Sequence, residues 1–206
     1  MKNHIFQIGI FISLSILLLL SSCKHEYQQM VDRELASGVR NDSLFLDIHF
    51  GMDKKDFFEL CWDMNKKGLV RQGNKNTTVQ FDMNINDKKA LVDFYPDFYQ
   101  DKIYQMPITY SYQHWSPWLK HFWSDTLQVE LVDIYEKTYG DFLAIEHPKL
   151  GNAFVRVDGN RRISIYKKGD QEVRVIFTDL ITEPKVPKID RSLADKNLPV
   201  WLRETK

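Results

Sequence analysis

Segments in which apolar and polar residues alternate recur throughout residues 44–180, and turn residues separate most of them. Alternation puts the apolar side chains on one face of an extended chain, which is typical of a sheet with one buried face. Short polar turns such as Asn86–Lys89, Asp158–Asn160 and Lys168–Asp170 indicate hairpins between neighbouring strands. The pattern predicts strands at Leu44–Phe50, Val79–Ile85, Ala90–Tyr95, Ile103–Tyr112, Ala153–Val157, Arg161–Tyr166 and Glu172–Phe177.

A helix is expected from about residue 53 to residue 67. Asp53 is a favoured N-cap residue, and Gly68 stands where a glycine commonly ends a helix. An apolar stripe at helical spacing runs along this segment, formed by Phe57, Cys61 and Met64. The stripe predicts that one side of this helix is buried.

A second helix follows the first group of strands. Ser116-Pro117 is expected to open it, with serine as the N-cap and proline at the first helical position. Ser124 then breaks or caps the helix again, and Gly140 ends the pattern. The order of elements predicts an α+β fold, in which an antiparallel sheet carries two helices on one face. It is also compatible with a tandem αβββ repeat, with halves at residues 44–112 and 113–180.

Residues 1–22 have the composition of an export signal. Lys2 lies in a short polar start, and Ile5–Leu20 is almost wholly apolar. This apolar run is marginal for crossing a bilayer, which needs roughly 20 apolar residues, so removal on export is favoured over an uncleaved anchor. Residues 23–43 are expected to form a tether that is helical in part, and residues 181–206, which contain prolines, a C-terminal tail.

The motif Leu20-Ser21-Ser22-Cys23 resembles the lipobox of bacterial lipoproteins. The resemblance implies that Cys23 becomes the first residue of the mature protein and carries covalent lipid, and no other cofactor is expected. Such a lipid would anchor the protein to a membrane of the bacterial cell envelope. Cys61 then has no partner for a disulfide, and its place in an apolar stripe predicts a core residue.

Phe50-Gly51-Met52-Asp53-Lys54-Lys55, followed by a helix and several strands, resembles the start of small outer-membrane lipoproteins with an αβββ-type domain. These include the accessory lipoprotein of the β-barrel assembly machinery and the tandem-repeat β-lactamase inhibitor proteins. The end of the second helix, Ile134–Gly140, is similar in kind. The resemblance implies a scaffold that binds proteins and has no active site, and it implies location at the outer membrane.

Several classes of function find no support in the residues. The 28 basic and 28 acidic residues balance, and they form no basic stripe, so nucleic acid is not an expected partner. The histidines are not spaced as metal ligands, and no metal site is expected. Contiguous motifs for nucleophilic catalysis and for phosphate or dinucleotide binding are absent. A hydrolase with catalytic residues dispersed along the chain stays open as an alternative.

Aromatic residues cluster in the middle of the chain, where they make up eleven of the thirty residues from Phe94 to Trp123. Such residues fill a core, form a protein interface, or stack on sugar rings. The candidate binding residues are Tyr99, Tyr104, Tyr110, Tyr112, Trp115 and Trp118. The leading hypothesis is a non-enzymatic envelope lipoprotein that binds another envelope protein. The alternative is a surface lipoprotein that binds glycans through this aromatic platform.

Overall fold

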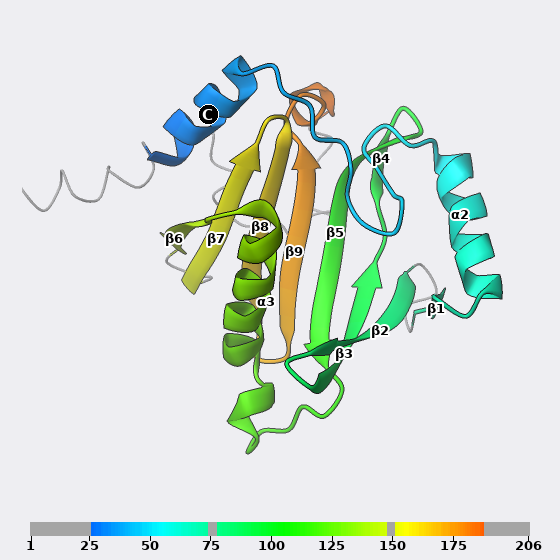
Figure 1. The fold of residues 1–206 in the computed structure, drawn as a ribbon, viewed down its shortest axis with the longest axis vertical. Helices are drawn as coiled ribbons and strands as arrows, with labels where there is room; N and C mark the ends of the chain where they lie inside the picture. Colours follow the sequence, from blue (N-terminus) through cyan, green and yellow to red (C-terminus); the bar gives the residue numbers. More distant parts are fainter. Residues whose placement is uncertain (1–25, 74–77, 148–150, 188–206) are drawn as a thin grey trace, which may run out of the picture.

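The computed structural model describes residues 26–73, 78–147 and 151–187. The expected signal at residues 1–22, Cys23 and most of the predicted tail lie outside these residues. Within them the chain forms three helices and a nine-stranded sheet (Figure 1), which confirms the α+β class. The helices are residues 26–36, α2 (Lys54–Lys66) and α3 (Ser124–Tyr139). The strands are β1 (Arg71–Gln72), β2 (Val79–Ile85), β3 (Lys88–Phe94), β4 (Asp97–Tyr99), β5 (Lys102–Tyr112), β6 (Leu143–His147), β7 (Gly151–Asp158), β8 (Arg161–Lys168) and β9 (Glu172–Asp179).

All the strand pairs are antiparallel, and the sheet order is β1-β2-β3-β5-β9-β8-β7-β6, with β4 paired to β5. The predicted hairpins form, but the turn from β2 to β3 is shorter than expected. Its central residues are Asn86 and Asp87, with φ values of 45° and 63°. Asn and Asp tolerate this left-handed conformation, which suits the twist of a two-residue hairpin. The pairing of β5 with β9 joins the two groups of strands into one sheet.

One face of the sheet carries α3, and the main core lies between them (Figure 1). Leu127, Leu131 and Tyr135 project from the buried side of α3. They belong to the same buried cluster as alternate residues of the central strands, such as Ile108 and Val175. We call this side the α3 face and the opposite side of the sheet the rear face.

The helix predicted near residues 53–67 is confirmed as α2, and Gly68 follows its end with a φ of 71°. Phe57 is fully buried, and its ring lies 6.0 Å from the rings of Tyr95 and Phe98. The expected side-chain cap does not form, because Asp53 instead pairs with Lys102 at 3.2 Å. The placement of both helices on one face and the tandem repeat stay predictions.

The strand predicted at Leu44–Phe50 is wrong. This segment is a tight loop in which only Ser43 and His49 form a bridge. The backbone N–H of Ile48 donates to the carbonyl of Phe45 at 2.9 Å, and Leu46 turns into the left-handed region with a φ of 50°. Leu44, Ile48 and Phe50 are nevertheless buried. The loop therefore anchors its apolar residues in the core without pairing as a strand.

The helix start predicted at Ser116-Pro117 is also wrong. The backbone N–H of Leu119 donates to the carbonyl of Ser116 at 3.2 Å, which closes a turn. A 3₁₀ turn, η1 (Lys120–Phe122), follows, and α3 begins only at Ser124. The Ser124 hydroxyl donates to the carbonyl of Gly169 at 2.7 Å, so this start is fixed by the β8–β9 turn. The strands β1, β4 and β6 had no counterpart in the predicted pattern.

Candidate functional site

Two of the six aromatic candidates, Tyr110 and Tyr112, are buried beneath α3. The hydroxyls of Tyr110 and Tyr135 are hydrogen-bonded at 2.9 Å. The hydroxyl of Tyr112 donates to Glu130 at 2.5 Å, and Lys88 pairs with the same carboxylate. These side chains find their polar partners inside the fold. We therefore assign them to the attachment of α3 to the sheet.

The other four candidates do not form one surface. Tyr99 and Tyr104 are half-buried near the turn between β4 and β5. Trp115 and Trp118 follow the far end of β5, and Trp118 is 80% exposed. The eight residue steps from Tyr104 to Tyr112 span about 27 Å in an extended strand. The structure thus separates the residues of the predicted platform into a buried pair and two remote groups.

The buried tyrosine pair predicts loss of stability at alkaline pH. Burial raises the pKa of Tyr110 to about 12, and burial also raises the pKa of Tyr135 well above its ordinary value. Above about pH 10 the unfolded chain loses these protons while the folded chain keeps them. The stabilisation is present below this pH, and the free energy of unfolding then falls by up to about 1.4 kcal/mol per pH unit for each tyrosine.

Urea unfolding on either side of about pH 10 measures this decrease. The variant Tyr135→Phe removes one of the two ionisable groups, so its stability should fall less steeply with pH than that of the natural chain. Equal slopes for the two proteins would contradict this prediction. So would phenolate absorbance that rises at the ordinary tyrosine pKa for every tyrosine of the folded protein.

A different set of large apolar side chains is exposed on and after α2: Phe58, Trp62 and Leu69 are 46%, 62% and 58% exposed. Phe58 and Trp62 lie one helical turn apart on α2, outside the buried stripe that contains Phe57 and Met64. The Phe58 ring is supported by Phe57 at 5.7 Å, and Lys66 Nζ lies 5.3 Å from the Trp62 ring. We call Phe58, Trp62 and Leu69 the α2 surface.

An open hollow lies beside the first turns of α2, with a volume of about 670 Å³. Phe58 contributes to its wall, so the hollow is continuous with the α2 surface. Charged residues of both signs complete the lining: Asp53, Lys54, Lys55, Asp56 and Asp101. Exposed aromatic residues with charged residues beside them are typical of protein–protein interfaces, in which the charges lie at the rim. Phe58 and Trp62 were not among the binding residues predicted from the sequence, although both are large apolar residues lying off the buried stripe of a predicted helix.

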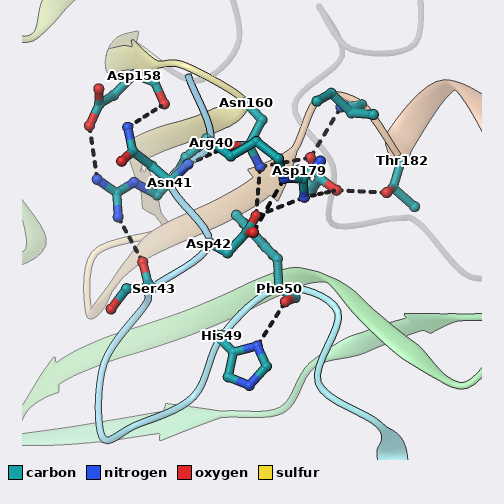
Figure 2. A network of polar contacts seen from close by, with 12 residues as sticks. Arg40, Asn41, Asp42, Ser43, His49, Phe50, Asp158, Asn160, Asp179 and Thr182 are labelled. Carbon is teal, nitrogen blue, oxygen red and sulfur yellow. Dashed lines mark hydrogen bonds and ion pairs between the residues drawn. The ribbon is translucent and has the colours of Figure 1, made fainter. Parts of the chain in front are cut away.

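The segment before the domain is fastened to one end of the sheet (Figure 2). The buried side-chain amide of Asn160 donates to the carboxylates of Asp42 and Asp179 at 3.1 and 3.0 Å. Its oxygen accepts from the backbone N–H of Asn41 at 2.6 Å. We call these four residues the N-terminal network. Because its groups satisfy one another, we assign it a structural role.

The helix over residues 26–36 is held at the same end of the sheet. Arg162 donates to the hydroxyl of Tyr27 at 3.3 Å. The backbone N–H of Gly159 donates to Glu34, also at 3.3 Å. The helix predicted within the tether is therefore present, and it contacts the domain in addition to connecting it to the preceding residues.

Groups with catalytic or metal-binding chemistry are dispersed. Within residues 26–73, 78–147 and 151–187, no three His, Cys, Asp or Glu side chains are grouped to hold a metal ion. Burial raises the pKa of the half-buried Cys61 thiol to about 11, so the nucleophilic thiolate is scarce at neutral pH. None of the described helices is long and apolar enough to cross a membrane. Comparison of the chain with protein-family models, curated proteins and solved structures found no match.

Proposed function

We propose that the protein is a lipid-anchored binding protein of the bacterial cell envelope, and that the α2 surface and its adjacent hollow bind another envelope protein. The observation that carries this proposal is the exposure of Phe58 and Trp62 one helical turn apart on α2, with Leu69 exposed just after the helix. Folded proteins seldom leave large apolar residues together in water unless another molecule covers them. Trp in particular contributes strongly to the binding energy of protein interfaces.

The anchor is supported by the export signal at residues 1–22 and by the lipobox-like motif ending at Cys23. Location at the outer membrane is supported by the resemblance to outer-membrane lipoproteins. A protein partner is favoured over a lipid surface because Asp53, Asp56 and Asp101 line the hollow together with Lys54 and Lys55. Carboxylates in this number would be repelled by anionic headgroups.

Affinity capture from gently solubilised envelopes tests the proposal with the full lipoprotein as bait. We expect one envelope protein at near-stoichiometric yield, and we expect the double variant Phe58→Ala/Trp62→Ala to lose it. Trp118→Ala is the matched control, because Trp118 is exposed as well but lies outside the α2 surface. A Cys23→Ala bait, which cannot carry the lipid, separates capture by the protein from capture by shared membrane.

The proposal fails if the double variant captures the same protein as the natural chain does. It fails equally if Trp118→Ala loses the partner while the double variant keeps it, because that result would return the binding site to the aromatic loop after β5. Folding of each variant is checked by thermal unfolding. The exposed positions of all three side chains predict only small changes in stability.

A further inference from the structure

The rear face carries a pocket that lies outside the α2 surface. It is formed by β2, β3, β5 and β9 and has a volume of about 280 Å³. This volume is at the lower end for ligand sites in proteins and suits one small molecule. Its lining includes the polar side chains of Gln80, Asp93, Thr109, Ser111, Glu172 and Arg174. We call it the rear pocket.

Strand register explains why these polar residues meet. Asp93 of β3 lies opposite Thr109 of β5, and Thr109 lies opposite Arg174 of β9. Their chain neighbours, such as Val92 and Val175, point into the core on the α3 face. Because side chains alternate along a strand, the three polar residues form one row across the rear face.

The carboxylate of Asp93 is held in a fixed position. The buried amide of Gln80 donates to both of its oxygens, at 3.1 and 3.0 Å, and the hydroxyl of Thr78 donates to one oxygen at 3.2 Å. A carboxylate has about four lone-pair sites, so Asp93 can still accept from a ligand. It is therefore a pre-positioned hydrogen-bond acceptor.

Arg174 supplies donors beside this acceptor. Its Nε is buried and has no hydrogen-bond partner among the described residues. Arg174 lines the pocket and is only partly buried, so the rest of its guanidinium can donate to a ligand there. Glu172 adds a second carboxylate, which pairs with Lys168 at 3.4 Å. The lining of the rear pocket thus contains a positively charged donor, Arg174, and two negatively charged acceptors, Asp93 and Glu172.

We infer that the rear pocket binds one sugar unit of a glycan. A sugar hydroxyl both donates and accepts, so adjacent hydroxyls can bond to Asp93 and Arg174 together. A simple anion would instead be repelled by the carboxylates of Asp93 and Glu172, and a simple cation would be repelled by the guanidinium of Arg174. Leu91 and Pro107, which also line the pocket, offer apolar contacts for the C–H groups of the ring.

Ligand-observed NMR titration of the full chain with neutral monosaccharides tests the assignment, with glycine and inorganic phosphate as competing probes. We expect saturable binding of at least one sugar with a dissociation constant of roughly 1 mM. Asp93→Asn and Arg174→Gln should each weaken it at least tenfold. Asp133→Asn, an exposed change on α3, is the matched control and should leave it unchanged. Thermal unfolding verifies that each variant is folded.

Absence of saturation by every sugar overturns the inference, and so does tighter binding of glycine or phosphate. Unchanged sugar binding in both Asp93→Asn and Arg174→Gln overturns it as well. The variant Phe58→Ala/Trp62→Ala should bind sugar as the natural chain does. The two sites are thereby tested independently, and failure of one leaves the other standing.

Discussion

Replacing Phe57 by alanine is expected to lower the free energy of unfolding by about 3–5 kcal/mol, whereas replacing its neighbour Phe58 should cost about 1 kcal/mol or less. Phe57 is fully buried and contacts the rings of Tyr95 and Phe98. Its removal leaves a cavity between α2 and the sheet. Phe58 is already 46% exposed, so water fills the space that its ring occupied and no internal cavity forms.

Denaturant unfolding of the two variants measures this difference directly. Phe58→Ala should then keep the fold but weaken capture of the partner protein. Phe57→Ala should reduce capture only in proportion to the unfolded fraction. Equal stabilities for the two variants would contradict the assignment of inner and outer sides of α2. Normal capture by Phe58→Ala would remove that residue from the α2 surface.

Replacing Asn160 by alanine is expected to lower the free energy of unfolding by about 2–4 kcal/mol. The change removes the donor shared by the Asp42 and Asp179 carboxylates and the acceptor for the Asn41 N–H. Asn160→Asp should be worse still at neutral pH, because a third carboxylate replaces an amide that donates to two others. The network would then repel the N-terminal segment.

Limited proteolysis at Arg40 measures whether that segment comes loose, and urea unfolding measures the loss in stability. Cleavage should become faster in Asn160→Ala and faster again in Asn160→Asp. Asn84→Ala, an exposed change on β2, is the control and should change neither quantity. Slow cleavage in both Asn160 variants would show that the segment is held by other contacts, such as those of Tyr27 and Glu34.

The alternating pattern predicted the long strands β2, β5, β8 and β9, including β8, whose residues Arg161–Tyr166 are buried on both faces of the sheet. It failed for Leu44–Phe50, because a loop with three residues anchored in the core has the same pattern as a strand. The capping signal at Ser116-Pro117 placed the helix start too early, because the start of α3 is fixed by a contact between Ser124 and Gly169, 45 residues further along the chain. Strands of two or three residues such as β1 and β4 are too short to give a periodic pattern.

The binding surfaces were harder to predict from the sequence. Tyr110 and Tyr112 follow Ile108 at alternate positions of one strand, so their burial was open to prediction from the same periodicity that predicted the strand. Asp93, Thr109 and Arg174 are remote in the chain. They meet only because β5 pairs with both β3 and β9, and no local pattern specifies that pairing. Long-range strand order was therefore the missing information.

The contacts of residues 26–43 bear on how far the domain can reach from a membrane. If Cys23 carries the lipid, only four residue steps separate it from Tyr27, which is hydrogen-bonded to the domain. A fully extended chain spans about 14 Å over that distance. The domain would then stay next to the bilayer with little freedom to rotate, and its effective concentration toward partners in the same membrane would be high. Under that condition partners would have to come to the membrane surface, because a domain held this closely could not extend across the envelope to reach them.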